Sequence, residues 1–173
     1  MRRMSFSLLL VVITLALVRV NLAAINQSDY PAFFQTQHQS VLQQWLKVRP
    51  QLRLASEADC VNKEGLLATR QEYGENYQPY YAVGDFNRDR AEDFAVALFN
   101  NQRRARKFSI AIFNGPFGGK APARPVFYRD GVDLSDGGLV LRPDKLLLAG
   151  VFQTNNCIVL MPQGRTYVIK DCL

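Results

Sequence analysis

The residues best suited to chemistry in this sequence form a short acidic loop between two apolar runs. Oxygen-bearing side chains fall at the first, third, fifth and ninth positions of the loop: Asp85, Asn87, Asp89 and Asp93. Ca²⁺ prefers about six to eight hard oxygen ligands, and alternate positions of a tight loop converge on one centre, with the carbonyl of Ala91 as a further ligand. Carboxylates held this close repel one another without a cation. The spacing therefore predicts a calcium-type loop.

The segments on either side of this loop are expected to be strands, whereas the loop of an EF-hand lies between helices and ends in a bidentate Glu. Residues 84–96, Gly-Asp-Phe-Asn-Arg-Asp-Arg-Ala-Glu-Asp-Phe-Ala-Val, resemble the strand–loop–strand motif of FG-GAP or VCBS-type repeats. The resemblance implies calcium bound by the side chains of Asp85, Asn87, Asp89 and Asp93 and by the carbonyl of Ala91. That family builds β-propellers in extracellular proteins, but a single copy in a chain of this length cannot form one.

Two arginines depart from the repeat motif, which has glycine at the fourth and sixth loop positions. Here these positions hold Arg88 and Arg90. A side chain at positive φ costs about 1 kcal/mol. Two guanidinium groups would also weaken cation binding, or would replace the metal by pairing with Asp85 and Asp89. Calcium binding and a metal-free loop with Arg–Asp pairs are both left open.

The three cysteines favour one disulfide and one remaining thiol, because the chain is expected to be exported. Cys157 and Cys172 flank a stretch that looks like a hairpin and could face each other across paired strands. Cys60 with either of them is the alternative, and the spacing does not choose among the three pairings. No Cys-x-x-Cys motif occurs, so the cysteines are interpreted as structural.

Aromatic, basic and histidine side chains offer weaker signals. Tyr73, Tyr77, Tyr80 and Tyr81 are a candidate platform for a sugar ring or a peptide, although such tyrosines more often bury one face. The basic run 103–107 is interpreted as a solvated hairpin tip. His38, the only histidine, is expected on the surface, and a Ser-His-Asp or Cys-His enzyme would have to depend on it alone.

The N-terminal 24 residues have the layout of a secretory signal peptide: two arginines, an apolar stretch from Phe6 to Val18, and Ala23-Ala24. The alternative is an uncleaved anchor, in which Arg19 reaches the membrane interface. Either interpretation exports residues 25–173, which we expect to form one globular domain in the periplasm or outside the cell. Removing Arg2, Arg3 and Arg19 with this segment would lower the net charge from +6 to +3, which does not indicate a nucleic-acid partner.

The remaining pattern predicts an α+β fold. Apolar residues from Phe34 to Leu46 recur at helical spacing and predict one amphipathic helix of about five turns between Ser28 and Pro50. From residue 80 onward, short β-rich runs alternate with turn residues. We expect the helix to pack on a twisted antiparallel meander of about five to eight strands. The runs are 80–83, 93–99, 108–113, 126–128, 139–142, 146–152, 157–161 and 167–170.

The sequence favours an exported, non-enzymatic binding protein with one structural calcium-type loop and an unknown protein or polysaccharide partner. A periplasmic inhibitor or immunity-type protein has the same features. The alternative from another class is a hydrolase of extracellular or cell-wall polysaccharide, with acid–base carboxylates drawn from Asp85, Asp93, Glu72 and Glu75. A membrane contact is expected only if residues 6–24 remain as an anchor.

Overall fold

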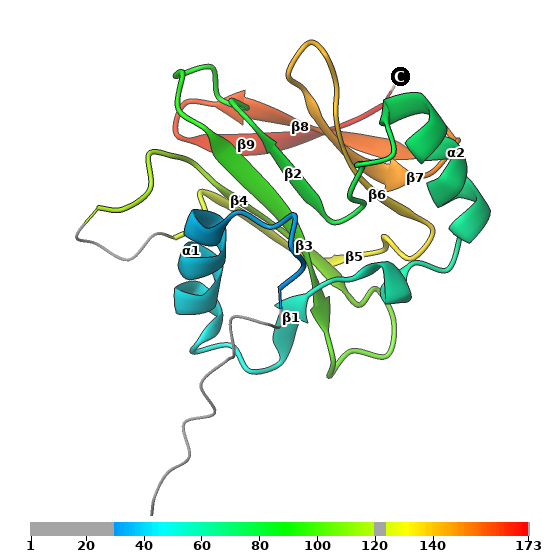
Figure 1. Ribbon diagram of the computed structural model, residues 1–173, viewed down its shortest axis with the longest axis horizontal. Coiled ribbons are helices and arrows are strands. Elements are labelled where there is room, and N and C mark those ends of the chain that lie inside the picture. Colours follow the sequence, from blue (N-terminus) through cyan, green and yellow to red (C-terminus); the bar gives the residue numbers. More distant parts are fainter. Residues whose placement is uncertain (1–29, 120–123, 173) are drawn as a thin grey trace, which may run out of the picture.

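In the part of the chain that it describes, a computed structural model shows two α-helices and nine strands in two antiparallel sheets (Figure 1). The structure describes residues 30–119 and 124–172. The expected mixed class with antiparallel sheets is confirmed. The strands are divided between a five-stranded and a four-stranded sheet, whereas a single meander was expected. The N-terminal signal or anchor segment lies outside the described residues.

The five-stranded sheet is built around two strands that are apolar on both faces. β3 (Asp93–Asn100) and β4 (Phe108–Phe113) form its centre, and β5 (Phe127–Val132) continues it beyond β4. β1 (Leu52–Leu54) and β2 (Tyr81–Gly84) both pair with the other side of β3, one after the other. A strand buried on both faces needs a layer on each side.

The four-stranded sheet supplies one of these layers. It is a meander of β6 (Gly137–Leu141), β7 (Leu147–Val151), β8 (Cys157–Gln163) and β9 (Thr166–Asp171). Side chains from both sheets share one core, to which Ala95, Ile110, Leu139, Leu147 and Leu160 belong. Alternate residues along β3 and β4 enter this core, as the two-residue period of a strand requires.

The first helix, α1 (Thr36–Leu46), shares a second core with the other face of β3 and β4. Its buried residues Val41, Leu42, Trp45 and Leu46 meet Phe94, Val96, Leu98 and Phe113. The helix has 11 residues and is shorter than expected. A turn in which the amide of Phe34 donates to the carbonyl of Pro31 precedes it, and the expected N-cap at Ser28 lies outside the described residues.

A second helix, α2 (Lys63–Tyr73), was not expected from the sequence. Its first turn is capped by Asn62, whose Oδ1 accepts from the amide of Gly65 at 2.8 Å. A short 3₁₀ helix, η2 (Glu57–Asp59), precedes it. Figure 1 shows α1 and α2 at opposite sides of the molecule. Neither helix, in the part of the chain that the structure describes, has the length and apolar content needed to span a bilayer.

Candidate functional site

The acidic loop connects β2 to β3, and its two ends are held together by the paired residues Gly84 and Asp93. Phe86 is buried in the core between the sheets. Because this ring fixes the start of the loop, the oxygen-bearing residues after it have a defined position. The expected strand–loop–strand arrangement is therefore present at residues 81–100.

Asp93 is fully buried and acts as the hydrogen-bond acceptor that shapes the loop. Its Oδ2 accepts from the amides of Phe86 at 2.9 Å and Asn87 at 3.3 Å, and its Oδ1 accepts from the amide of Gly115 at 3.0 Å. Burial raises the pKa of this carboxyl even though the three amides lower it. A Cβ at Gly115 would lie 2.4 Å from the carbonyl oxygen of Glu92, so this approach requires glycine.

The exposed half of the loop is ordered by two overlapping turns. Oδ1 of Asn87 accepts from the amide of Asp89, and Oδ1 of Asp89 accepts from the amide of Ala91. The side-chain amide of Asn87 also donates to Oδ2 of Asp89 at 2.8 Å. Such side-chain-to-backbone bonds are typical of Asn and Asp in turns. Each of these oxygens of Asn87 and Asp89 therefore accepts one hydrogen bond and keeps a second lone pair for a cation.

Arg88 and Arg90 adopt the left-handed conformation that glycine favours, with φ angles of 65° and 72°. These are the two positions at which the repeat motif has glycine. The backbone thus follows a glycine-like path in spite of the substitutions, at a cost on the order of 1 kcal/mol for each residue.

The cation beside the loop carboxylates comes from another part of the chain. Nζ of Lys145, in the turn between β6 and β7, lies 3.2 Å from Oδ2 of Asp85. Arg88 points to the same turn and donates to the carbonyl of Asp144 at 3.4 Å. Within residues 30–119 and 124–172, neither Arg88 nor Arg90 forms an ion pair with Asp85 or Asp89. The alternative of Arg–Asp pairs is therefore replaced by a contact with Lys145, which the sequence analysis missed.

Asp85 retains capacity for a further ligand. Its Oδ1 is buried and has no hydrogen-bond partner among the described residues. Desolvation raises its pKa, but the contact with Lys145 acts in the opposite direction, and the pKa is lowered overall. A carboxylate kept ionised, with one free oxygen, fits the donor set of a hard cation.

Side-chain clusters give no independent sign of a metal. No group of three or more His, Cys, Asp or Glu side chains in the described part of the chain is arranged to hold an ion. The predicted set includes three such side chains, Asp85, Asp89 and Asp93, and in this structure they are not arranged as an ion-binding group.

Three of the four predicted ligand tyrosines line one groove. This hollow of about 360 Å³ lies between β2 and the edge strand β6. Just before β2, the carbonyl of Pro79 accepts a hydrogen bond from the amide of Leu139 in β6 at 2.7 Å. Its aromatic lining consists of Tyr73, Tyr77, Tyr81 and Phe33, and the sequence analysis missed Phe33. Tyr73 and Phe33 are each 43% exposed.

The fourth tyrosine belongs to the core. The ring of Tyr80 is buried between the sheets, and its hydroxyl donates to the carbonyl of Leu134 at 3.1 Å. The buried hydroxyl of Tyr77 has no hydrogen-bond partner among the described residues, and a Cβ at Gly138 would lie 2.7 Å from it. Burial raises the pKa of Tyr77. Both hydroxyls are therefore protonated at neutral pH.

His38 is 1% exposed, so its expected surface position is wrong. Its ring stacks on Phe94, and its Nδ1 lies 2.7 Å from the hydroxyl of Tyr81. Nε2 lies 3.6 Å from a carboxylate oxygen of Glu92. Burial lowers the pKa of His38, although Glu92 acts in the opposite direction, and burial raises the pKa of Tyr81 to about 12. The helix turns this residue toward β2 and β3 because it shares a face with Leu42 and Trp45.

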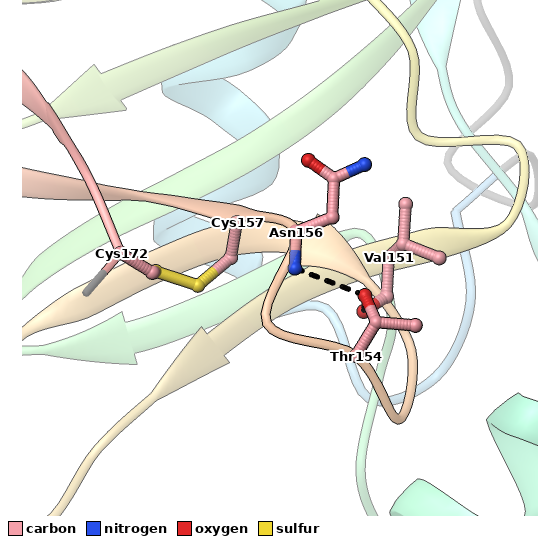
Figure 2. The surroundings of a disulfide bond; sticks show 5 residues. All are labelled: Val151, Thr154, Asn156, Cys157 and Cys172. Atoms are coloured by element: carbon pink, nitrogen blue, oxygen red, sulfur yellow. Dashed lines mark hydrogen bonds between the residues drawn. A yellow bond between two sulfur atoms is a disulfide. The ribbon is translucent and has the colours of Figure 1, made fainter.

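The disulfide joins Cys157 and Cys172, one of the three pairings that the spacing left open (Figure 2). The amide of Cys172 donates to the carbonyl of Cys157 at 3.0 Å, so the bridge closes the open end of the β8–β9 hairpin. The turn before Cys157 is held by Thr154, whose hydroxyl donates to the carbonyl of Val151 and accepts from the amide of Asn156. Cys60 is a buried free thiol.

The carboxylates proposed for a hydrolase do not share one environment. Asp93 is buried under backbone amides and Asp85 faces Lys145, whereas Glu72 and Glu75 are exposed at the end of α2. Glu72 lines a separate hollow of about 240 Å³ on the side of β6 and β7.

Comparison of the chain with protein-family models, with curated proteins and with solved structures finds no match.

Proposed function

We propose that this chain is an exported, non-enzymatic binding protein that holds an extended protein segment in the groove between β2 and β6. The observation that carries the proposal is the convergence on one open hollow of Tyr73, Tyr77 and Tyr81, which are neighbours in the sequence, with Phe33 from a distant segment. Export is supported by the apolar N-terminal run and by the disulfide.

The groove has the chemistry of a peptide-binding surface. One wall is β2, which pairs only with β3 among the described strands, and the other wall is β6, which lies beside it. An extended peptide would lie over the hollow between these two walls, where pockets receive alternate side chains. The rest of the lining includes Val83, Leu139 and Leu141, which suit apolar side chains better than sugar hydroxyls.

In this proposal the acidic loop has a structural role. Asp85, Asn87, Asp89 and Asp93, with the carbonyl of Ala91, would hold Ca²⁺ if it displaces Lys145 from Asp85. The ion would supply a cross-link that fixes the connection between β2 and β3. Because β2 forms one wall of the groove, a fixed loop would keep that wall in place.

The experiment is a selection of displayed peptides on the immobilised protein, followed by affinity measurements with the enriched sequences. Tyr73→Ala is compared with Tyr128→Ala, because the two tyrosines are equally exposed, at 43% and 42%, and only Tyr73 lines the groove. Loss of an aromatic contact at the centre of an interface typically costs 2 kcal/mol or more, about 30-fold in affinity.

The expected result is enrichment of peptides with alternating apolar residues, whose affinity falls for Tyr73→Ala and not for Tyr128→Ala. No enrichment, or equal affinity in both variants, would overturn the peptide groove. Binding of β-linked oligosaccharides that depends on Tyr73 would replace the protein partner with a polysaccharide.

A further inference from the structure

Two turns lie at one end of the five-stranded sheet (Figure 1), and the sequence of both is rich in lysine and arginine. One is the loop between β3 and β4, residues 101–107, and the other is the connection from α1 to β1, residues 47–51. The amide of Asn101 donates to the carbonyl of Gln51 at 3.0 Å and fixes them side by side. We call these two turns the basic end. They contain no acid and six cations: Lys47, Arg49, Arg103, Arg104, Arg106 and Lys107.

Internal contacts use only part of this charge. Arg103 pairs with Asp130 at 2.8 Å, and the guanidinium of Arg49 lies over the ring of Trp45 at 4.1 Å. Lys47, Arg104 and Arg106 form no ion pair within 4.0 Å with a carboxylate of the described residues. Asp133 accepts from the amide and hydroxyl of Ser135, and the charge of Arg106 also helps to lower the pKa of this carboxyl. The basic end therefore keeps an excess of exposed positive charge.

An exposed apolar side chain lies among these cations. Val48 is 76% exposed, although it sits directly between Lys47 and Arg49. At a membrane, apolar side chains enter the boundary below the headgroups while Lys and Arg contact anionic lipids.

The start of the described chain lies near the same end. Pro31 lines a hollow of about 340 Å³ together with Leu54, the last residue of β1, and Ala55, which follows it. The apolar run from Phe6 to Val18 precedes it in the sequence. A chain emerging from a membrane would therefore reach the domain beside β1, close to the residues that carry the charge.

We propose that the basic end is a docking surface for an anionic lipid bilayer, with Val48 entering the interface and the arginines and lysines contacting the headgroups. This contact is separate from the groove between β2 and β6, and it orients the domain whether the N-terminal segment is retained or removed.

The test is sedimentation with vesicles of phosphatidylglycerol and phosphatidylcholine, compared with vesicles of phosphatidylcholine alone. Each variant is expressed from the full-length sequence and purified without further processing, so that all variants have the same N-terminus. The patch variant is Arg104→Gln/Arg106→Gln/Lys107→Gln. The matched control, Arg124→Gln/Arg165→Gln/Lys170→Gln, removes the same charge from exposed positions outside the basic end.

At roughly fivefold for each cation near an anionic surface, the patch variant should bind the anionic vesicles about 100-fold more weakly, while the control retains most of the affinity. Val48→Ser should lower vesicle affinity roughly threefold to fivefold and leave the elution salt on a heparin column unchanged.

Equal binding by the wild type and the patch variant would overturn the proposal. Equal losses in the patch and control variants would do the same, because the effect would then follow net charge alone. Patch-dependent retention on heparin or on single-stranded DNA, without patch-dependent vesicle binding, would assign the surface to a soluble polyanion instead. Circular dichroism and the unfolding midpoint verify that each variant is folded.

Discussion

Nζ of Lys145 lies 3.2 Å from Oδ2 of Asp85, across a sequence separation of 60 residues. The contact joins the loop after β2 in one sheet to the turn after β6 in the other. It places a positive charge beside the first residue of a predicted calcium loop. If the loop binds calcium as proposed, the ion and the ammonium group of Lys145 would compete for the same carboxylate.

Replacing Lys145 should reveal this competition. Lys145→Gln is expected to lower the unfolding midpoint in EDTA, because Asp85 loses its only ion pair among the described residues. The same variant should respond to calcium at a lower concentration than the wild type, since the ion no longer displaces an ammonium group. A ligand that binds only the native state raises stability by RT ln(1 + [L]/Kd). Thermal unfolding across a calcium titration measures both effects.

Two further variants make this titration decisive. Asp89→Ala removes a predicted ligand and should abolish the response to calcium. Lys170→Gln removes an exposed lysine elsewhere and should behave as the wild type does. Should no variant respond to calcium up to millimolar concentration, the loop is metal-free and Lys145 is its permanent partner.

Asp93 should be the least replaceable residue of the loop. Both carboxylate oxygens of Asp93 accept hydrogen bonds from backbone amides. In Asp93→Asn, an NH₂ group would replace one of these oxygens, so the backbone amide opposite it would lose its acceptor. An unsatisfied buried donor costs about 1–3 kcal/mol, and we expect Asp93→Asn to reduce the free energy of unfolding by roughly 2 kcal/mol. Urea titration in EDTA measures this change.

The control for this variant is Asp89→Asn, because Asp89 is exposed and a change there should remain within about 0.5 kcal/mol in EDTA. Burial of the Asp93 charge is itself unfavourable, as the raised pKa of this carboxyl indicates. If Asp93→Asn were as stable as the wild type, the relief of that charge would outweigh the lost acceptor.

Local sequence patterns predicted the strands well and the long-range contacts poorly. Each of the eight β-rich runs overlaps one of the strands β2 to β9, because alternation and turn residues act over a few positions. β1 was missed because three residues are too short to show a period. α2 was missed because only Gly65, Leu66 and Thr69 in it are buried, so it lacks a clear apolar stripe.

The candidate site was likewise predicted in its local part and missed in its long-range contacts. The strand–loop–strand arrangement around Asp85 and Asp93 follows from local spacing. Lys145 and Gly115 reach the loop from distant turns, and only the pairing of the two sheets determines which turns those are. The position of His38 was wrong for a related reason: the polar glutamines beside it concealed that it shares a helix face with Leu42 and Trp45.

His38 should make stability depend on pH. Burial lowers its pKa in the folded state, so the unfolded chain binds the proton more tightly. The contribution of the neutral ring is fully present above the unfolded-state pKa of about 6.5 and is lost as the pH falls below it. We therefore expect wild-type stability to decrease from pH 7.5 to pH 5, as measured by urea unfolding at a series of pH values.

His38→Phe isolates this contribution. Phenylalanine can stack on Phe94 as the imidazole does, but it lacks the hydrogen bond to Tyr81. At pH 7.5 the variant should be less stable by about 1 kcal/mol, the net value of one hydrogen bond. That deficit should shrink toward pH 5, where only the wild type has a histidine to protonate. A deficit that stays constant between these pH values would show that His38 does not titrate in this range.

The pairing of Cys157 with Cys172 predicts how the protein responds to reductant. The bridge spans 15 residues, and closing a loop of that size in the unfolded chain is worth about 3 kcal/mol. Reduction should lower the free energy of unfolding by about this amount. The double variant Cys157→Ser/Cys172→Ser should have this lower stability already, and reductant should not change it.

Cys60 is 2% exposed, and burial raises the pKa of its thiol. The oxidised protein should therefore show one reactive thiol in denaturant and none in the native state. Rapid reaction of Cys60 in the native protein would contradict its burial, and a disulfide-linked peptide that contains Cys60 would contradict the pairing of Cys157 with Cys172.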